Sequence, residues 1–544
     1  MRKSGVIDWL NLLQNGVTRR GLFYQGGLAA LLGSFGGSPA PAQAALKIGP
    51  GLYDSIGVKP VINCKGTFTI ISGSLSLPEV KQAMFEASNY YVHIDELMDA
   101  VGKRIAEITG AESAIVTCGC AAALTHATAG CIAGGNPENI QRLPDLSGLK
   151  NEIIAPDYSR NVYDHAVRLV GVKMVTVSSL EELRRSITAR TAMIMVLGTT
   201  KDRGPFGLEP ISKIARERGV PVLVDAAAEN LTIPNVHLQR GADLVAYSGG
   251  KALRGPQSAG LLIGRKDLIR AAWTNSSPHH TLGRPMKVGK EDIMGMLAAV
   301  EMWIKRDHKA EWRAWESWLD EIARSVKRVA GVSTNVLLPR GLSNNSPRLE
   351  VRWDSAKLGV YGEEVEKQLW DGDPRIVLSR GRGNRREGGE SSVIVMPWQM
   401  QPGDVKVVAE ALHGKLSTPT KPQGITTTGP GAKIGGQWEV EIDYTLSPAR
   451  HTLFIEQEGD ELVGSHRGDR TGGDLKGWVS GEQVHFSSRH RWEGASFSFT
   501  FDGKARGESM EGEVDLGEYF TANWSARRHQ YGELTRPSRP RKNI

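Results

Sequence analysis

One stretch of this chain, from Asp225 to Gly264, restricts most strongly how the rest of it can fold. It opens with the apolar run VPVLVD (220–225), which ends on a carboxylate, and continues with a second run, ADLVAY (242–247). The second run stops at SGGK, so Lys251 stands at the start of a turn rich in glycine and proline. Short apolar runs bounded by such turns predict buried strands. We take 242–247 as the last strand of a sheet whose strand ends carry an acid and an amine.

An acid and a lysine in this order suit the chemistry of pyridoxal phosphate (PLP). That cofactor needs an amine that forms a Schiff base with its aldehyde. It also needs a carboxylate that keeps its ring nitrogen protonated. We assign Lys251 to the first role, as the catalytic base, and Asp225 to the second. Taken singly, each residue is more often a plain surface group, but together, among small residues, they favour the cofactor.

The segment that contains the lysine resembles the cofactor-lysine segment of the selenocysteine synthase-like group of fold type I PLP enzymes. That group includes bacterial L-seryl-tRNA(Sec) selenium transferase and the ammonia-lyases that act on D-glucosaminate 6-phosphate. The resemblance implies an α/β fold class, with a large domain built on a parallel-type sheet and a smaller α+β domain. It extends from about Gly51 to Leu416 and is carried by SGGKALRGPQSAGLLIGRKDLI (248–269), VINCKGTFTIISGS (61–74), TGAESAIVTCGCAAALTHATAGCIAG (109–134) and LGTTKDRGPFGLEPI (197–211).

A second part of the predicted site follows the short apolar run AIVT (114–117), which leads into CGCAAA and an alanine-rich helical stretch. Free backbone N–H groups and the helix dipole at a helix start favour an anion. We therefore expect Gly119, Cys120 and Ala121 to bind the cofactor phosphate through the backbone, with Ser248 donating a hydroxyl. The alternative is a tight packing turn without a ligand.

Several further side chains are candidates for the site. The resemblance implies a flat side chain over the cofactor ring, for which His165 is the first choice and Tyr163 the second. A histidine that simply packs at a helix start is the alternative. Arg160 and, in the small domain, Arg380 are candidates for an anionic substrate group, since a guanidinium matches a carboxylate with two hydrogen bonds. A solvated basic surface is the alternative for both.

The periodicity between these motifs predicts alternating strands and helices. Thr191–Thr200 and 220–225 read as strands and Leu208–Gly219 as the amphipathic helix between them. Such units imply parallel pairing with right-handed crossovers. Ligands in these sheets bind beyond the carboxyl ends of the strands. We also expect continuous helical structure over 79–110 and over 291–329.

Residues 1–44 have the features of an export signal. They contain the twin-arginine motif TRRGLF (18–23), an apolar stretch (26–35) and the small-residue pattern PAQA (41–44). The apolar stretch is too short for a stable membrane span. We therefore expect the twin-arginine export machinery as a partner and a periplasmic or other extracytoplasmic location.

The rest of the chain divides by composition into further segments. We predict a large PLP-binding domain (45–290), a linking helix with a small α+β domain (291–416), a linker (417–436), an antiparallel β domain (437–530) and a basic tail (531–544). Period-two alternation in the β domain predicts a barrel or a sandwich. No cluster of histidines, cysteines or paired carboxylates stands out in it, so we interpret it as a binding or stabilising module.

Charge and cysteine content argue against two other classes of protein. The net charge of +7 is spread along the chain, and no base-reading or stacking motif indicates nucleic-acid binding. The four cysteines do not have the spacing of zinc ligands, so we predict no metal. A small-molecule substrate remains as the expected partner.

The predicted function is a PLP-dependent lyase or transferase that acts at the α- or β-carbon of an amino acid or amino sugar acid. Selenium transfer to seryl-tRNA is less favoured, because of the export signal and the missing N-terminal tRNA-binding domain. Gly250 also stands where the family commonly has an acidic residue. An aminotransferase and a non-catalytic binding protein on the same scaffold are further alternatives. The resemblance implies a homodimer or a larger homo-oligomer.

Overall fold

The computed structural model describes residues 46–383, 389–419 and 431–530. The predicted export signal, most of the predicted linker and the basic tail therefore lie outside the described residues. The chain separates into a unit that ends at Val61 and a unit that begins at Ile62. In the described part of the first unit, a short 3-10 helix spans Asp54–Ile56. The remaining description concerns the second unit.

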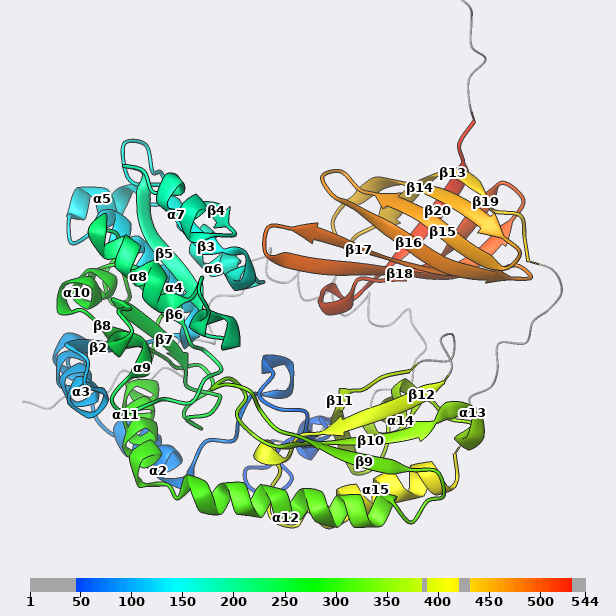
Figure 1. The fold of residues 1–544 in the computed structure, drawn as a ribbon, viewed down its shortest axis with the longest axis horizontal. Coiled ribbons are helices and arrows are strands. Elements are labelled where there is room, and N and C mark those ends of the chain that lie inside the picture. The colour runs from blue at the N-terminus through cyan, green and yellow to red at the C-terminus, as the bar shows by residue number, and fades with distance from the viewer. Residues whose placement is uncertain (1–45, 384–388, 420–430, 531–544) are drawn as a thin grey trace, which may run out of the picture. The chain divides into compact units, whose positions relative to one another are not determined.

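The large domain is built on a seven-stranded sheet with the order β2-β8-β7-β6-β5-β3-β4 (Figure 1). All neighbouring strands are parallel except those that pair with β8, which runs antiparallel to both β2 and β7. The strands are β2 (Ser113–Thr117), β3 (Glu152–Pro156), β4 (Lys173–Val177), β5 (Thr191–Leu197), β6 (Val222–Asp225), β7 (Leu244–Ser248) and β8 (Gly260–Gly264).

The prediction that 242–247 forms the last strand of this sheet is wrong, because β8 follows it. The five residues of β8, GLLIG, are all buried. A buried strand of this kind is hydrophobic throughout and lacks the alternation that reveals a half-exposed strand. Its glycines made the segment look like a continuation of the turn after Lys251.

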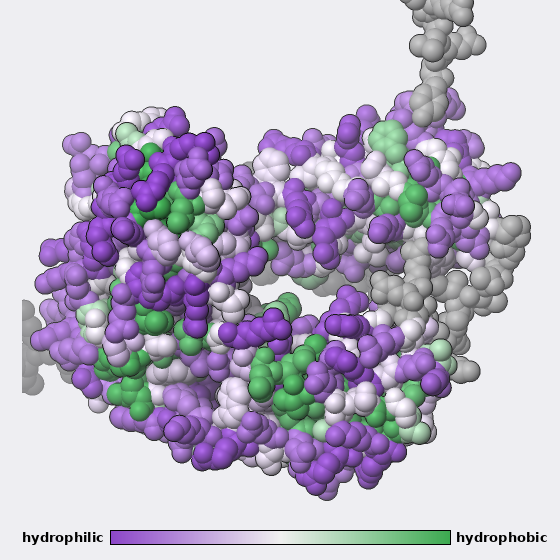
Figure 2. Space-filling view, viewed as in Figure 1, coloured by the Kyte–Doolittle hydropathy of each residue, from purple (hydrophilic) through white to green (hydrophobic). Residues whose placement is uncertain are grey.

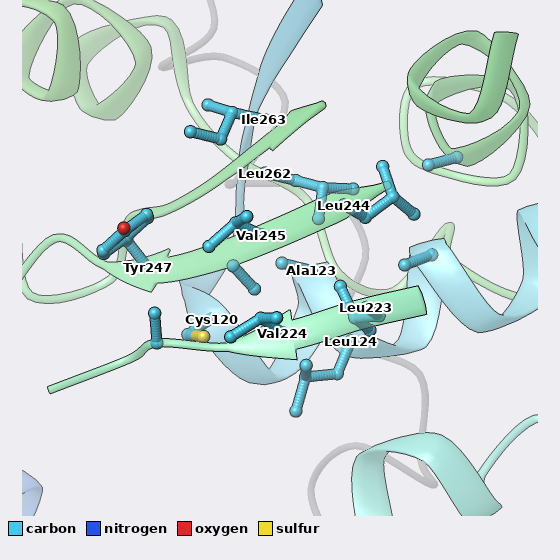
Figure 3. Close-up of a cluster of buried hydrophobic side chains, with 14 of the residues drawn as sticks. Cys120, Ala123, Leu124, Leu223, Val224, Leu244, Val245, Tyr247, Leu262 and Ile263 are labelled. Atoms are coloured by element: carbon cyan, nitrogen blue, oxygen red, sulfur yellow. The ribbon is translucent and has the colours of Figure 1, made fainter. Parts of the chain in front are cut away.

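The core of the large domain lies between this sheet and α4 (Gly119–Ala133). Figure 3 shows Cys120 and Leu124 of α4 beside Leu223 and Val224 of β6, with the side chains of β7 and β8 in the same cluster. Because α4 is covered on nearly all sides, it has no polar face, and small residues let it approach the strands closely. The start of α4 is thus fixed against the carboxyl ends of the strands.

Helices surround the sheet, and two of the predicted helical stretches are each interrupted. The stretch 79–110 is divided into α2 (Pro78–Ser88) and α3 (Ile94–Thr109), and 291–329 into α11 (Lys290–Lys305) and α12 (His308–Val326). The second break has a clear cause: Asp307 accepts a hydrogen bond from the backbone N–H of Ala310 and so caps the start of α12. The other helices of this domain are α5 (Pro137–Arg142), α6 (Asp164–Arg168), α7 (Leu180–Ser186), α8 (Leu208–Glu217), α9 (Val236–Gln239) and α10 (Lys266–Thr274).

The small domain has an α+β fold with its own core, which includes the buried Trp353 and Leu378. Its sheet has the order β1-β11-β12-β10-β9. The elements are β1 (Val61–Cys64), β9 (Ser333–Leu337), β10 (Arg348–Asp354), α13 (Ser355–Leu358), α14 (Gly362–Trp370), β11 (Arg375–Arg380), β12 (Glu390–Val395) and α15 (Asp404–Ser417). The first strand of this sheet comes from residues 61–64, which we predicted to be part of the large domain.

The C-terminal β domain is a closed eight-stranded antiparallel barrel, which decides between the two architectures predicted for it. Buried residues alternate with exposed ones along its strands, and the face seen in Figure 2 is mainly hydrophilic. The strands are β13 (Gly436–Asp443), β14 (Pro448–Glu458), β15 (Glu461–Arg467), β16 (Gly472–Ser480), β17 (Gln483–Trp492), β18 (Ala495–Arg506), β19 (Ser509–Asp515) and β20 (Thr521–Arg528). Among the helices of the described residues, none has the length and apolar character needed to cross a membrane.

Candidate functional site

A cavity of about 540 Å³ lies at the carboxyl ends of the strands in the large domain. Asp225 ends β6 and Ser248 ends β7, while β2 leads into α4 through Cys118. Because β2, β6 and β7 all point the same way, their ends meet at one edge of the sheet. Seven of the ten residues predicted for the site line this cavity: Lys251, Asp225, Ser248, Gly119, Cys120, Ala121 and Tyr163.

Asp225 is a buried carboxylate, with 3% of its surface exposed. One carboxylate oxygen accepts a hydrogen bond from the backbone N–H of Ala227 at 3.1 Å and lies 3.8 Å from the thiol sulfur of Cys120. Burial raises the pKa of Asp225, and the charge of Lys251 opposes that rise. A buried carboxylate of this kind is stabilised by a cationic partner placed next to it.

The start of α4 forms another wall of the cavity. Cys118, the residue before the helix, makes no side-chain hydrogen bond to the first turn. The first turn of a helix has backbone N–H groups without partners inside the helix. Gly119 has a φ of +81°, a left-handed conformation that glycine adopts without strain. The cavity wall therefore offers backbone donors to an anion.

The turn that carries Lys251 is held against a glutamine. A Cβ atom added at Gly250 would lie 1.9 Å from Oε1 of Gln257, and one added at Gly73 would lie 1.8 Å from the same atom. The carboxamide of Gln257 thus occupies the space beside both glycines, and Gln257 also lines the cavity. The glycine before the lysine, which differs from the common family pattern, makes room for this side chain.

The two candidates for the flat side chain over the ring lie in different places. Tyr163 directly precedes α6 and lines the cavity, and burial together with the charge of Asp225 raises its pKa. His165, within α6, is exposed and is not among the residues that line the cavity. The structure therefore brings Tyr163, and not His165, next to Asp225 and Cys120.

The two arginines predicted to meet substrate do not line the cavity. Arg160 is occupied by Asp164, with 2.5 Å between Nε and a carboxylate oxygen of a side chain that is almost fully buried. Arg380 ends β11 with 75% of its side chain exposed, at 3.4 Å from the carboxylate of Glu363. Each of the two arginines therefore forms an ion pair within the protein.

Several cavity residues were not predicted from the sequence. Ser258 donates a hydrogen bond to Asp292, at the start of α11, with 2.9 Å between the oxygens, and both line the cavity. The others are Thr69, Ser76, Met84, Leu124, Ala227 and Pro256. Most come from segments far from the lysine in sequence. The position of Ser258 in the same loop as Lys251 was a signal that could have indicated it.

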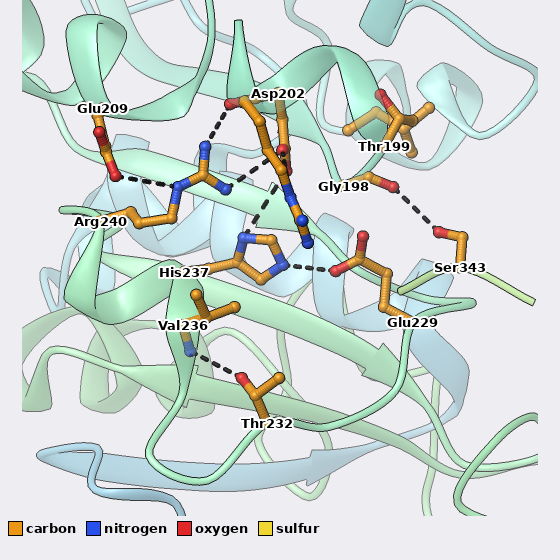
Figure 4. Close-up of polar contacts among 12 residues, drawn as sticks. Gly198, Thr199, Asp202, Glu209, Glu229, Thr232, Val236, His237, Arg240 and Ser343 are labelled. Atoms are coloured by element: carbon orange, nitrogen blue, oxygen red, sulfur yellow. Dashed lines mark hydrogen bonds and ion pairs between the residues drawn. The ribbon is translucent and has the colours of Figure 1, made fainter. Parts of the chain in front are cut away.

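A buried polar network lies beyond the strand ends, around His237 of α9 (Figure 4). Nε2 of His237 is 2.5 Å from a carboxylate oxygen of Glu229, and Nδ1 is 3.8 Å from one of Asp202. These three side chains place one possible metal ligand each within 4.8 Å of one another. Asp202, however, already accepts a hydrogen bond from the guanidinium of Arg240 at 3.2 Å. Because Arg240 and His237 already contact these two carboxylates, we interpret the network as an internal polar cluster.

The residues of the cavity fit PLP. Asp225 is a buried carboxylate without a cationic hydrogen-bond partner among the described residues, as a protonated ring nitrogen requires. The start of α4 offers donors for a phosphate, Lys251 offers the amine, and the volume suits a small cofactor. A sheet with one antiparallel strand, β8, and these groups at its carboxyl edge defines the class of fold type I PLP-dependent enzymes.

Comparison with known proteins gives the same assignment. Residues 62–332 match the family model described as L-seryl-tRNA selenium transferase. The chain is 29% identical over 377 residues to D-glucosaminate-6-phosphate ammonia lyase of Salmonella typhimurium, which covers 66% of this chain and 94% of the relative. It is 35% identical over 352 residues to 5'-C-glycyluridine monooxygenase-decarboxylase of a Streptomyces species, which covers 60% of this chain and 83% of the relative.

A solved structure of D-glucosaminate-6-phosphate ammonia-lyase is similar to this chain, with a TM-score of 0.60 and 28% sequence identity. The similarity covers 68% of this chain and 98% of that one. The chain therefore belongs to the selenocysteine synthase-like family of PLP-dependent enzymes. The matches cover at most about two thirds of the chain.

Proposed function

We propose that this protein is a PLP-dependent lyase that acts on an amino acid or amino sugar acid. The observation that carries the proposal is the cavity in which Lys251, the buried Asp225 and the start of α4 come together. The similarity to an ammonia-lyase over nearly the whole length of that relative supports elimination of a substituent next to the amino group. An amino sugar acid is the substrate class that the name of the same relative suggests.

When bound, PLP supplies an electron-withdrawing ring that stabilises negative charge at the substrate α-carbon. Lys251 would hold the cofactor through its Nζ and then take the proton from the α-carbon as a general base. Asp225 would keep a proton on the ring nitrogen, since a negative charge beside that nitrogen favours its cationic form. The backbone N–H groups at Gly119–Ala121 would hold the phosphate, and Tyr163 would cover part of the ring.

The test is a product assay on the PLP-loaded protein with D- and L-amino acids and 2-amino sugar acids, with and without a 6-phosphate. Elimination releases ammonia and a 2-oxo acid in equal amounts. Lys251→Ala should abolish release of both products. Lys150→Ala serves as the matched control, because Lys150 does not line the cavity. If no substrate of either class yields ammonia above the Lys251→Ala variant, elimination is excluded.

Decarboxylation coupled to oxidation is the second candidate, because the Streptomyces relative named for it is 35% identical to this chain. It would consume oxygen and release carbon dioxide. An aminotransferase would instead require a 2-oxo acid acceptor and release no ammonia. Selenium transfer would require a seryl-tRNA substrate. The same substrate panel separates these functions from elimination when oxygen uptake and amino-group transfer to an acceptor are measured as well. A non-catalytic binding protein would give no product in any of these assays.

We further propose export through the twin-arginine machinery and assembly into a homodimer or a larger homo-oligomer. The TRRGLF motif and the apolar stretch after it support export. The family resemblance supports the homo-oligomer. Arg19→Lys with Arg20→Lys should retain the protein in the cytoplasmic fraction, whereas unsubstituted protein should appear outside it. Light scattering on the purified protein measures the oligomer, and a monomer at all concentrations would contradict the second proposal.

A further inference from the structure

The barrel contains a chain of three buried histidines that the PLP site does not use. His451 lies on β14, His466 on β15 and His490 on β17, and their exposed fractions are 8%, 1% and 0%. Nδ1 of His451 is 2.8 Å from Nε2 of His466. Nδ1 of His466 is 3.1 Å from Nε2 of His490. Three imidazoles are thus linked nitrogen to nitrogen inside the barrel.

Glycines on the neighbouring segments make room for these rings. Gly473 of β16 pairs with His466, so no side chain separates β15 from β17 at this level. A Cβ atom added at Gly473 would lie 3.1 Å from Cδ2 of His490. At Gly468, a Cβ atom would lie 3.2 Å from Cε1 of His451. The rings therefore fill space that the adjacent residues leave open.

Two ring nitrogens of the chain have hydroxyl partners. Nδ1 of His466 is 2.6 Å from Oγ of Ser488, and Nδ1 of His490 is 2.8 Å from Oγ1 of Thr471. Burial and the neighbouring imidazoles lower the pKa of His466 to about 2, so its ring is neutral at physiological pH. Neutral imidazole is the form that binds metal ions.

The spacing of the first link is close to that of two metal ligands. With metal–nitrogen bonds of about 2.0–2.1 Å, two nitrogens on one tetrahedral ion stand roughly 3.3 Å apart. The observed 2.8 Å between His451 and His466 requires a separation of only a few tenths of an ångström more. In the present link one of these nitrogens carries a hydrogen. A metal ion would take the place of this hydrogen between the two nitrogens. The proton would move to the other nitrogen of the same imidazole ring and would not be released.

We propose that His451 and His466 bind one divalent transition-metal ion, such as Zn²⁺ or Cu²⁺, inside the barrel, with Ser488 and His490 positioning the ring of His466. Metal-binding histidines regularly donate their other N–H to a fixed acceptor, which sets the tautomer. Oγ of Ser488, 2.6 Å from Nδ1 of His466, can act as that acceptor when the metal ion holds Nε2 of the same ring. His490 contributes through His466 and does not itself need to reach the ion.

An acidic residue at the rim favours a cation in this part of the barrel. Asp469 is exposed and lies in the turn between β15 and β16. Burial lowers the pKa of His451, and the charge of Asp469 opposes that change, so the carboxylate is within electrostatic reach of the ring. Two imidazoles, with water in the remaining positions, form a donor set that zinc and copper both accept.

The test is calorimetric titration of the chelator-treated full mature chain with Zn²⁺ and Cu²⁺. We expect one equivalent to bind in the micromolar range or tighter. His451→Gln and His466→Gln should each weaken binding by at least about a hundredfold, and Ser488→Ala by about 10–100-fold as an outer-sphere change. His485→Gln is the matched control, because His485 lies on β17 but pairs with Asp502 on the outside of the barrel. His237→Gln controls for the buried ion-pair network in the large domain and should also leave binding unchanged.

Spectroscopy keeps the proposal testable if a histidine variant fails to fold. The electron paramagnetic resonance spectrum of Cu²⁺ bound to the unsubstituted chain should show coupling to imidazole nitrogen, and Ser488→Ala should change that spectrum. Absence of binding to the unsubstituted chain would overturn the proposal. Binding that persists unchanged in folded His451→Gln and His466→Gln would overturn it as well. Neither outcome depends on PLP or on catalytic activity.

Discussion

Replacing Gly260 by alanine tests whether the start of α4 holds the cofactor phosphate. Gly260 begins β8 and lies against the first turn of α4. A Cβ atom at this position would lie 2.3 Å from the backbone carbon of Gly119 and 2.5 Å from the backbone nitrogen of Cys120. Backbone atoms cannot rotate away, so β8 and α4 must separate by about 1 Å to reach the ordinary contact distance of 3.4 Å.

The expected result is a specific loss of cofactor affinity. A misplacement of about 1 Å in a positioning element can cost about a hundredfold, so we predict that Gly260→Ala weakens PLP binding by about 10–100-fold. Overpacking should also lower the free energy of unfolding by about 1–3 kcal/mol. A PLP titration followed by absorbance and urea unfolding of the PLP-free protein measure the two effects separately.

Gly135→Ala is the matched control, because a Cβ atom there would meet no atom within 4 Å. It should leave PLP affinity and stability nearly unchanged. If Gly260→Ala lowered the stability but bound PLP as tightly as the unsubstituted protein, the phosphate would not be held at this helix start.

Three further changes test other parts of the site. Asp225→Asn should abolish activity. In the PLP-free protein it should also remove a pH dependence of the free energy of unfolding. Because burial raises the pKa of Asp225, this side chain contributes fully to stability below its ordinary pKa of about 3.9, and the contribution is lost as the pH rises through its pKa in the folded protein. Urea unfolding across the acid-to-neutral range measures this. Glu229→Gln breaks the buried pair with His237 and should lower the free energy of unfolding by about 3–5 kcal/mol. Gly250→Ala should displace the carboxamide of Gln257 and weaken PLP binding in an absorbance titration, and adding Gln257→Ala should restore part of the loss.

Each of these predictions has a result that contradicts it. An unchanged pH dependence in Asp225→Asn would show that the buried carboxylate does not titrate as described. Arg184→Ala, which removes an exposed ion pair with Glu217, should cost less than about 1 kcal/mol, and a similar small cost for Glu229→Gln would contradict the buried-pair argument. If the double variant at 250 and 257 bound PLP no better than Gly250→Ala, the crowding argument would fail.

The sequence predicted the central strands and the helix between them well, because their hydrophobic patterns are unambiguous. The run VPVLVD ends as β6 on Asp225, and the amphipathic segment from Leu208 forms α8 with its apolar side against the sheet. The rule that ligands bind beyond the carboxyl ends of parallel strands then placed Asp225 and Ser248 at one edge. Hydrophobic pattern could not predict β8, since five buried residues with glycine at both ends have no period.

Other parts of the site depend on contacts between distant segments, which the local sequence pattern does not predict. Asp292 reaches the cavity because α11 begins beside Ser258, and this is a consequence of tertiary packing. Tyr163 and His165 are two residues apart, and only the turn before α6 decides that Tyr163 lines the cavity. In the barrel, the three histidines are separated by 15 and 24 residues in sequence. Strand register brings them together, and the inward position of each on a period-two strand was the signal that could have indicated it.

The visible absorption spectrum of the purified protein, beside that of Lys251→Ala, tests the central claim most directly. We predict that the unsubstituted protein is yellow or becomes yellow with added PLP, because an imine between a lysine and this cofactor absorbs visible light. Lys251→Ala should lack the band while remaining folded, and reduction with borohydride should fix the cofactor to Lys251 only. A folded protein that stays colourless with excess PLP, or a band that persists in Lys251→Ala, would contradict the assignment of this cavity as a PLP site.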